Sequence, residues 1–486
     1  MKRVAPLFLT GLVALAACSD DLTPVAPSAS DAAFNESAAD GSGTYLVRFK
    51  GNGVPTGFEA RVAALGGEVI FAHPVGIAAV SGLTTGTAGQ LAADGTIAAV
   101  DADMETELPQ SDETTLESTD AQPESPTNPA TALRYSRQWN MKAIGASQAW
   151  AAGKLGSPSV KVGILDSGLD YLHPDLVGRV DLTLSRSFLS AAENARVQAA
   201  FPGAHPIADL HYHGTHVGST VTSNAYIYAG VSSNVTLVGL KACSPGTAAN
   251  GFRGSCPTSG SLAAILYAAD NGVNIINMSI GGRFNRRDAS AQGGFGPSLL
   301  ASINQVFNYA HRKGTTIVVS AGNDAIDMDH DGNGYKSFCS VPTVICVSAT
   351  GPTSATTVNG PWANIDALAG YSNYGRSAVS VAAPGGNGVS VTAACSGFTI
   401  VTSLLACRNR FFISPTNWSA FSLGASGTSM ASPHVTGLAA LIASDGITQP
   451  AQIRARIEGS ADDLGEPGTD PKYGKGRISA AHAFGF

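Results

Sequence analysis

The feature that most constrains this chain is a serine held in a turn of small residues directly before an apolar run. Residues 427–434 read Gly-Thr-Ser-Met-Ala-Ser-Pro-His, and apolar residues continue over 435–442. The pattern predicts a helix with Ser429 at its N-terminus. A serine hydroxyl is a poor nucleophile by itself, so a catalytic role requires a nearby base and a third group that orients the base.

Two earlier motifs supply groups of this kind. Residues 160–168 read VKVGILDSG, which predicts a buried strand that runs into a glycine turn. Asp166 then stands at the carboxyl end of the strand, where open α/β sheets place their sites. Residues 213–218 read HGTHVG and offer the imidazole of His213 among small residues. The chain order Asp166, His213, Ser429 is one of the orders known for Ser-His-Asp catalysis.

The three motifs together resemble those of the subtilisin-like serine protease family. They follow one another at separations of 47 residues (213 − 166) and 216 residues (429 − 213). The resemblance implies an α/β fold over residues 139–486, with a doubly wound, mostly parallel sheet and helices on both faces. A fourth segment, residues 315–323 (TTIVVSAGN), reads as a buried strand that ends in Asn323. This residue matches the oxyanion asparagine of the family.

The chemistry that the resemblance implies is acyl transfer through an acyl-enzyme. His213 would take the proton of Ser429, and Asp166 would fix the tautomer of the imidazole. The side-chain amide of Asn323 and the backbone N–H of Ser429 would stabilise the oxyanion. Taken singly, each residue has an ordinary alternative, because an aspartate, serine or asparagine at such positions usually caps a turn or a helix.

Three other functions are weighed against this prediction. His211, His213 and His216 suggest a zinc cluster, but no further ligand at the usual spacing is evident. A catalytically inert binding module with the same fold would be expected to lose at least one of the four catalytic groups. A serine esterase of the α/β-hydrolase type would carry a Gly-x-Ser-x-Gly elbow, which is absent around Ser429.

The composition is that of a globular enzyme without a nucleic-acid partner. The 486 residues are 44% hydrophobic and 13% charged, which supports a large core. A net charge of −7 leaves no basic cluster to neutralise phosphates. We expect a monomer that acts on protein or peptide substrates and uses no organic cofactor.

The N-terminus predicts export. Lys2 and Arg3 precede a short apolar stretch, so residues 1–17 read as a signal peptide, too short for a confident membrane span. Residues 15–18 (LAAC) resemble a bacterial lipobox, whose cysteine, here Cys18, is acylated. The alternative is an ordinary signal peptide with an incidental cysteine. The protein is expected to be secreted or associated with the cell envelope, with a lipid on Cys18 as its sole membrane contact.

Three segments separate the signal from the predicted catalytic domain. Residues 18–43 read as a flexible tether, and residues 109–138 as an acidic linker, disordered over 109–130, that contains the autoprocessing region. Residues 44–108 resemble the inhibitory propeptide domain of subtilisin-like zymogens. Autocleavage is expected between Leu108 and Trp139, and it would separate a lipid on Cys18 from the catalytic domain. The small domain is predicted to hold strands at 45–49, 68–71, 76–81 and 97–100 and helices at 57–65 and 87–93.

Six cysteines remain when Cys18 is set aside, and an even number in an exported protein indicates disulfides. Free buried thiols are the alternative. Sequence proximity favours the pairs Cys243–Cys256, Cys339–Cys346 and Cys395–Cys407.

Substrate binding is inferred from the resemblance, in which an extended peptide pairs as a strand with the cleft. The segment that matches the cleft comprises Ser279, Ile280, Gly281 and Gly282, and Ala321 and Gly322 are expected to wall the primary pocket. A plain glycine turn would look the same. No fixed charge stands at these positions, so a broad or apolar preference is expected.

A structural calcium site is a further hypothesis. Residues 327–334 (DMDHDGNG) place oxygen-bearing side chains at alternate positions before a glycine turn: Asp327, Asp329, Asp331 and Asn333. Phe338 stands where an EF-hand requires glutamate, so the choice is between a lone calcium loop and a solvated acidic turn.

Residues 185–210 and 396–423 are expected to be enlarged surface loops.

Overall fold

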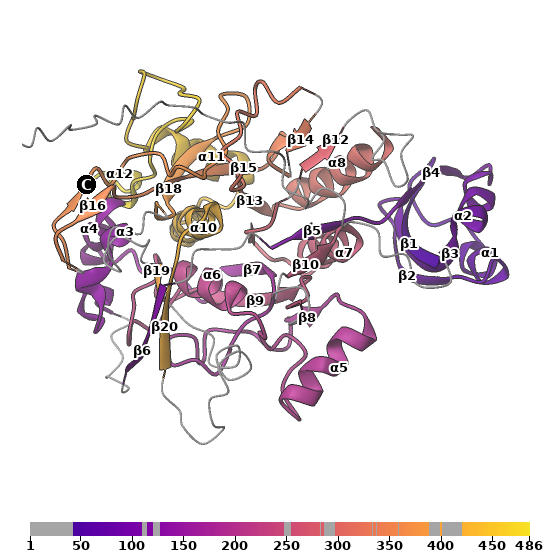
Figure 1. Cartoon of the computed structure of the whole chain (residues 1–486), viewed down its shortest axis with the longest axis horizontal. Helices are drawn as coiled ribbons and strands as arrows, with labels where there is room; N and C mark the ends of the chain where they lie inside the picture. Colours follow the sequence, from indigo (N-terminus) through magenta and orange to yellow (C-terminus); the bar gives the residue numbers. More distant parts are fainter. Residues whose placement is uncertain are drawn as a thin grey trace, which may run out of the picture. The chain divides into compact units, whose positions relative to one another are not determined.

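The computed structural model of the chain (Figure 1) describes residues 42–108, 114–119, 127–246, 254–281, 283–285, 297–332, 334–336, 338–357, 359–387, 399–400 and 420–486. Several predictions lie outside these residues: the signal peptide, nearly all of the tether, Cys18, Gly282, Asn333, Cys395 and Cys407.

A seven-stranded sheet forms the centre of the larger part of the chain. Its strand order is β18-β15-β13-β11-β7-β9-β8, and each pair of neighbours runs parallel. This confirms the predicted doubly wound α/β fold. The strands are β7 (Lys161–Asp166), β8 (Arg186–Ser187), β9 (Thr236–Lys241), β11 (Ile275–Met278), β13 (Thr316–Ser320), β15 (Ile345–Thr350) and β18 (Val381–Pro384).

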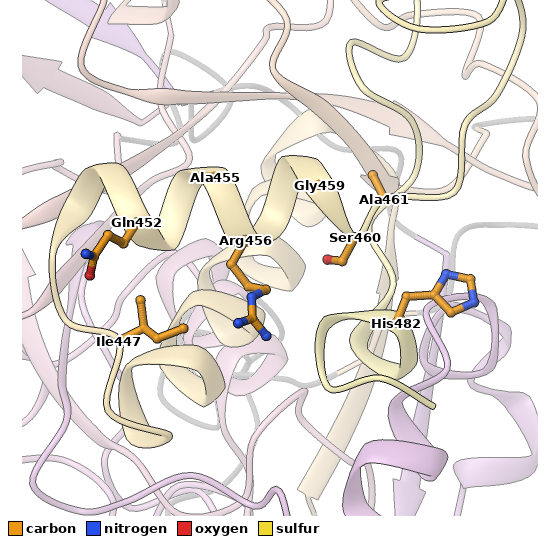
Figure 2. Close-up of a pocket in the computed structure, with 8 residues that line it drawn as sticks. All are labelled: Ile447, Gln452, Ala455, Arg456, Gly459, Ser460, Ala461 and His482. Carbon is orange, nitrogen blue, oxygen red and sulfur yellow. The ribbon is translucent and has the colours of Figure 1, made fainter.

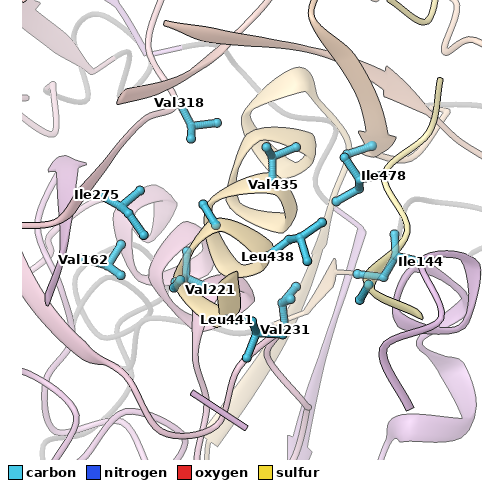
Figure 3. Packing of buried hydrophobic residues seen from close by; sticks show 14 of the residues in the cluster. Ile144, Val162, Val221, Val231, Ile275, Val318, Val435, Leu438, Leu441 and Ile478 are labelled. Atoms are coloured by element: carbon cyan, nitrogen blue, oxygen red, sulfur yellow. The ribbon is translucent and has the colours of Figure 1, made fainter. Parts of the chain in front are cut away.

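The strands β7, β9, β11, β13 and β15 divide their side chains between two apolar layers. Val162 and Ile164 of β7 belong to the layer that contains α6 and α10, whereas Leu165 belongs to the layer that contains α7 and α8. Figure 3 shows residues of the first layer, among them Val162, Ile275 and Val318 of the sheet and Val435 and Leu438 of α10. Because both faces are covered, the strands read as continuous apolar runs instead of alternating ones. The four helices are α6 (His213–Val221), α7 (Thr258–Asp270), α8 (Pro297–Arg312) and α10 (Thr428–Ser444).

Shorter elements complete this part of the chain. The helices are α3 (Trp139–Ala143), α4 (Ala146–Ala151), α5 (Ala191–Ala200), α11 (Pro450–Gly459) and α12 (Ala480–Ala483), with 3-10 turns at Pro129–Thr131, Tyr135–Arg137 and Phe338–Ser340. Small antiparallel ladders join β10 (Ser255–Pro257) to β5 (Glu105–Glu107), β12 (Arg283–Asn285) to β14 (Gly334–Lys336), and β16 (Ser354–Ala355) to β17 (Trp362–Ala363).

The N-terminal unit is a four-stranded antiparallel sheet, in the order β2-β3-β1-β4, with two helices. Its core includes Val47 and Phe49 from the sheet and Phe58 from the first helix. The elements are β1 (Ser42–Phe49), α1 (Phe58–Ala64), β2 (Glu68–His73), β3 (Ile77–Thr84), α2 (Thr85–Ala92) and β4 (Ile97–Ala102), each within a few residues of its predicted position.

Two segments differ from the sequence-based expectation. Residues 114–119, expected within an unstructured linker, form β6 (Thr114–Thr119), which pairs antiparallel with β20 (Ala420–Ala425) in a ladder that also includes β19 (Thr399–Ile400). The β-branched threonines of β6 suit a strand once β20 offers an edge. The loop expected over 185–210 contains α5. Ser190 caps this helix by accepting a hydrogen bond from the backbone N–H of Glu193 at 3.2 Å, a capping signature that the prediction overlooked.

Disulfides join Cys243 to Cys256 and Cys339 to Cys346, as predicted. The third predicted pair lies outside the described residues.

One buried carboxylate fixes the loop between α6 and β9. Asp175 has no exposed surface, and its oxygens accept hydrogen bonds from the backbone N–H groups of Tyr226 at 2.7 Å, Ile227 at 3.1 Å and Tyr228 at 3.2 Å. Burial raises the pKa of Asp175 to about 6, although these hydrogen bonds favour the ionised form. Three consecutive backbone amides of this loop share one side chain as acceptor, so the conformation of the loop depends on Asp175.

We predict that Asp175→Ala destabilises the protein by about 3 kcal/mol or more, because each buried group left without a partner costs about 1–3 kcal/mol. Urea-induced unfolding followed by tryptophan fluorescence measures the change. Asp445→Ala serves as the control, since Asp445 is 44% exposed and pairs with Lys154 at the surface. The control is expected to stay within about 0.5 kcal/mol of the wild type. Equal losses in the two variants would contradict the prediction.

Candidate active site

Asp166 and His213 form a buried pair at the carboxyl edge of the central sheet. Asp166 is the last residue of β7 and His213 the first of α6, and neither has exposed surface. His213 Nδ1 lies 2.8 Å from Asp166 Oδ1, which also accepts the backbone N–H of Ser167 at 2.7 Å. A carboxylate oxygen can only accept, so Nδ1 carries the proton and Nε2 is left as the basic nitrogen.

Two glycines allow the helix to approach the strand this closely. A Cβ atom placed on Gly214 would lie 2.2 Å from the carbonyl oxygen of Gly168. Gly168 itself has a φ of +123°, in the region that favours glycine. A glycine at position 214 is therefore required by the contact between α6 and the turn after β7.

Two opposing effects act on the imidazole of His213. Burial disfavours the charged imidazolium, but the carboxylates of Asp166 and, to a lesser extent, Asp209 outweigh burial and raise the pKa of His213 above its ordinary value. The pair therefore stabilises the imidazolium that forms when Nε2 accepts a proton.

Ser429 is the second residue of α10 and is fully buried. Its hydroxyl donates a hydrogen bond to the backbone carbonyl of Ser279 at 3.1 Å. His213 Nε2 makes no hydrogen bond to the part of the chain that the structure describes. The helices that carry Ser429 and His213 contact each other, but in this arrangement the serine hydroxyl bonds to Ser279 and not to the imidazole.

A proline explains how Ser279 is tied to the nucleophile. Pro433 stands four residues after Ser429 in α10 and has no N–H, so it cannot bond to the carbonyl of Ser429 as a helical residue normally would. The hydroxyl of Ser279 donates to that carbonyl instead, at 2.8 Å. Ser279 is held in turn by Asn277, whose Nδ2 donates to its hydroxyl at 2.9 Å.

Asn277 is a functional residue that the sequence analysis missed. It is buried in β11, and its Oδ1 accepts hydrogen bonds from the hydroxyls of Ser432 at 2.8 Å and Thr436 at 2.9 Å, both on α10. The strand is thereby fastened to the helix of the nucleophile. The available signal was an amide side chain inside the otherwise apolar strand Ile275–Met278.

Asn323, the predicted oxyanion residue, follows β13 and is oriented by Thr428. Its Oδ1 accepts hydrogen bonds from the backbone N–H of Thr428 at 2.9 Å and from the hydroxyl of Thr428 at 2.8 Å. The same hydroxyl accepts the backbone N–H of Gly322 at 3.0 Å. These bonds occupy the oxygen of the amide, so Nδ2 is the end that remains to donate to an oxyanion.

The predicted substrate-binding residues follow β11 and β13. Ser279 and Ile280 are fully buried, and Gly281 is half-buried. Ala321 is buried, and its N–H donates to the carbonyl of Val347 at 2.9 Å. Gly322 has a φ of +100°. A role of these residues in binding substrate stays a prediction.

The carboxylates of the predicted calcium loop bond to protein groups. Asp329 accepts the backbone N–H groups of Arg376 at 2.7 Å and Ser377 at 3.0 Å. Asp327 Oδ2 lies 2.8 Å from the ring Nδ1 of His330. The backbone carbonyl of Asp331 accepts the N–H of Gly334 at 3.2 Å. Calcium binding stays a prediction, and no step below depends on it.

The structure gives no support to a zinc cluster at His211, His213 and His216. Within the described residues, no group of three or more His, Cys, Asp or Glu side chains is arranged to hold a metal. His434 is a buried histidine of α10 that bonds within the fold. Its Nδ1 lies 2.8 Å from the carbonyl of Met430 and its Nε2 2.9 Å from Asn140 Nδ2, and burial lowers its pKa to about 4.

A hollow of about 850 Å³ lies over α11 and α12 (Figure 2), with Arg456 and His482 in its wall. Arg456 Nη1 donates to the carbonyl of Ala483 at 2.9 Å, and His482 Nδ1 lies 2.8 Å from Asp462 Oδ1. The polar groups of the hollow are thus bonded within the fold. No predicted catalytic residue lines it, so it is not the candidate active site.

We predict that Thr428→Val lowers kcat for peptide hydrolysis about tenfold or more with little change in KM. Valine keeps the shape of threonine but removes the hydroxyl that orients Asn323, and an oxyanion donor contributes about 10²- to 10³-fold, a figure measured in a subtilisin. Steady-state kinetics on a chromogenic peptide measure both constants. Thr428→Ser retains the hydroxyl and is the control, so similar kinetics for the valine and serine variants would contradict the prediction.

Comparison with known proteins extends the likeness beyond the motifs. The Subtilase family matches residues 157–476. A thermophilic serine proteinase from Bacillus sp. (strain AK1) is 31% identical over 330 residues, which cover 67% of this chain and 62% of that protein. Subtilisin DY from Bacillus licheniformis is 31% identical over 343 residues, which cover 70% of this chain and 96% of subtilisin DY.

Among solved structures, the epidermin leader peptide processing serine protease of Staphylococcus aureus is similar in fold. It superimposes with a TM-score of 0.65 at 21% identity, over 91% of this chain and 98% of that one. The family match, the identity to subtilisin DY and the buried Asp166–His213 pair agree with one another. The chain belongs to the subtilase family of serine proteases.

Proposed function

We propose that this protein is a secreted serine endopeptidase, made as an autoprocessed zymogen, that hydrolyses peptide bonds through Asp166, His213 and Ser429. The observation that carries the proposal is the buried 2.8 Å contact between His213 Nδ1 and Asp166 Oδ1. It leaves Nε2 as a base in the part of the fold where α10 presents a serine. Membership of the subtilase family supports the same chemistry.

In the proposed reaction, Nε2 of His213 takes the proton of Ser429 as the hydroxyl oxygen attacks the peptide carbonyl. Asp166 keeps the proton on Nδ1 and stabilises the imidazolium that forms. Nδ2 of Asn323 and the backbone N–H of Ser429 donate to the oxyanion. The imidazolium then protonates the leaving amine, and water repeats the cycle on the acyl-enzyme.

The resting arrangement requires one change before this reaction begins. The serine hydroxyl donates to the carbonyl of Ser279, so it must turn about its Cα–Cβ bond to reach Nε2 of His213. The side chains of the three proposed catalytic residues have no exposed surface. We propose that the full-length chain is the closed precursor and that processing opens the site.

The N-terminal unit is the proposed inhibitor, and the strand that directly follows it, β5, is added to the edge of another strand as a bound peptide would be. β5 pairs antiparallel with β10, in the register Thr106 opposite Cys256. The chain continues to Leu108, whose N–H donates to the carbonyl of Gly254 at 2.9 Å and whose side chain is 2% exposed. Addition of a strand to a sheet edge is a general mode of peptide recognition. Removal of β5 would free this edge for an extended substrate.

A second contact of the N-terminal unit completes helix α7. The N-cap of α7 is Pro257, which has no side-chain cap. Asp103 accepts the backbone N–H of Ser259 at 2.9 Å and also bonds to the hydroxyl of Ser259, so it caps the helix from another part of the chain. Burial raises the pKa of Asp103 to about 6, and the hydrogen bonds from Ser259 oppose this rise.

We place the processed bond between Leu108 and Thr114. The strand before this interval pairs with β10, and the strand after it, β6, pairs with β20, which leads directly to Ser429. Cleavage in this interval would separate the strand that pairs with β10 from the strand that pairs with β20. A lipid on Cys18 would belong to the released N-terminal unit, so maturation would also free the enzyme from the membrane. In the described residues, no helix is long and apolar enough to cross a membrane.

We predict that the full-length chain loses about its first hundred residues on incubation and that Ser429→Ala stays intact. Intact-mass spectrometry of both proteins after the same incubation checks this and locates the processed bond. A serine-directed phosphonate probe is expected to label the wild type alone. If both proteins remain whole and unlabelled, the inert binding module takes the place of the protease.

We predict that Asp103→Ala weakens the hold of the processed N-terminal unit and raises peptidase activity immediately after processing about tenfold. The change leaves the N–H of Ser259 without its acceptor, and a hydrogen bond to a charged group contributes about 1.5–3 kcal/mol. Hydrolysis of a chromogenic peptide, normalised to processed protein, measures the effect. Asp94→Ala is the control, because Asp94 lies in the same unit and bonds to Thr96 and Arg61 within that unit. Equal early activity of the two variants would argue against this role for Asp103.

A further inference from the structure

Asp209 is a buried carboxylate, four residues before His213, that the proposed reaction does not use. It has no exposed surface. Its oxygens accept five hydrogen bonds from four residues: the backbone N–H of His211 at 2.8 Å, that of Tyr212 at 3.1 Å, the hydroxyl of Ser167 at 3.0 Å, and the N–H and hydroxyl of Thr215 at 3.0 and 2.6 Å.

These donors belong to the two segments that carry the catalytic pair. Ser167 directly follows Asp166, and Thr215 lies in the first turn of α6, two residues after His213. The hydroxyl of Ser167 also accepts the N–H of Gly214 at 2.9 Å, so the two segments are tied to each other as well as to Asp209. A displacement of Asp209 would therefore move Asp166 and His213 relative to each other.

The backbone immediately before His213 is strained. Tyr212 has a φ of +87° and a ψ of −32°, a conformation that a side chain larger than glycine rarely adopts. The N–H of Tyr212 donates to Asp209, so the carboxylate helps to hold the residue in this conformation. The strained turn determines the direction in which α6 begins and hence where His213 stands.

A lysine provides the counter-charge for the buried carboxylate. Lys241 is 1% exposed, donates to the carbonyl of Ala208 at 2.7 Å and is attracted by the charge of Asp209. It stands opposite Asp166 in the register of β7 and β9. Burial lowers the pKa of Lys241 to about 8, so it is largely charged at neutral pH.

We infer that Asp209 is a positioning residue for the general base: it holds the strained turn at Tyr212 and ties the start of α6 to Ser167, so that His213 faces Asp166. The inference rests on the proposed peptidase activity. Asp209 does not touch His213 or the substrate in this scheme and acts through the backbone. Its charge has a second effect, because the carboxylate adds to that of Asp166 in raising the pKa of His213.

The test uses Asp209→Asn, alone and combined with Tyr212→Gly, expressed as the full-length chain and assayed after processing, with rates normalised to processed protein. Asparagine keeps the size of the side chain but loses the charge and one acceptor oxygen, so kcat on a chromogenic peptide is expected to fall about 10- to 100-fold with KM nearly unchanged. Glycine adopts a positive φ without strain, so the double variant is expected to regain about tenfold in kcat.

The pH profile separates positioning from a merely structural role. The acid limb of kcat/KM follows His213, which must be neutral to accept a proton. The other titratable groups around it are Asp166 on β7, His211 and Tyr212 in the same loop and Lys241 on β9. Of these, only Tyr212 changes, and only in the double variant. Asp209→Asn removes a negative charge that raises the pKa of His213, so the acid limb is expected to move to lower pH. The double variant should keep this shift, since glycine restores geometry and not charge.

Asp181→Asn is the matched control, because Asp181 also accepts two backbone N–H groups in a turn, those of Thr183 at 3.0 Å and Leu184 at 3.1 Å. The inference is overturned if Asp209→Asn has the same kcat and the same acid limb of kcat/KM as this control, or if the double variant is no faster than Asp209→Asn.

If Asp209→Asn yields no folded protein, Ser167→Ala is tested instead, because it removes one of the five hydrogen bonds to Asp209. A lower kcat with an unshifted acid limb then supports the inference, and an unchanged kcat overturns it. Failure of the proposed function would appear in the wild type, whereas failure of this inference appears in the variants alone.

Discussion

Enclosure of helix α10 is the constraint on which the rest of this structure depends. Residues 428–443 are all buried, and the helix contacts α6, α11 and several strands of the central sheet. A helix that is buried on every side needs a large core around it. The sheet and its flanking helices must therefore assemble before Ser429 has a defined position, so the place of the proposed nucleophile is a consequence of core packing.

Inside this core, polar side chains supply the hydrogen bonds that the regular backbone pairing does not provide. Pro433 deprives the carbonyl of Ser429 of its helical donor, and the hydroxyl of Ser279 replaces that donor. Asn277 joins β11 to α10 by the same means. A buried polar group without a partner costs about 1–3 kcal/mol, so alternative packings of these elements are disfavoured by several such groups at once. The networks thus specify one arrangement of the site.

The contact between the N-terminal unit and α7 follows the same rule. The helix begins after a proline and lacks a cap of its own, and Asp103 supplies the acceptor from a distant part of the sequence. The strand β5 likewise covers an edge at β10 that would otherwise be open. Both contacts satisfy groups that the larger part of the chain leaves unpaired, as the proposed inhibitory role of the N-terminal unit requires.

The sequence by itself determined the elements whose signals are local. Strands such as β7 and β13 are continuous apolar runs, the N-terminal unit has clear periodicity, and the residues of the proposed triad stand in short motifs of small residues. Helix α5 was missed although its capping signature is local, and β6 was missed because its strand exists through pairing with β20.

The tertiary structure alone decided which polar side chains serve the site. Asp209 reads in the sequence as an ordinary loop aspartate, and Asn277 as an isolated amide in a strand. Their importance comes from donors that lie far away in the chain, such as Ser167 for Asp209 and Thr436 for Asn277. Hydrogen bonds of this kind depend on distance and direction in space. Periodicity and composition describe only which face of an element is apolar, so they cannot reveal them.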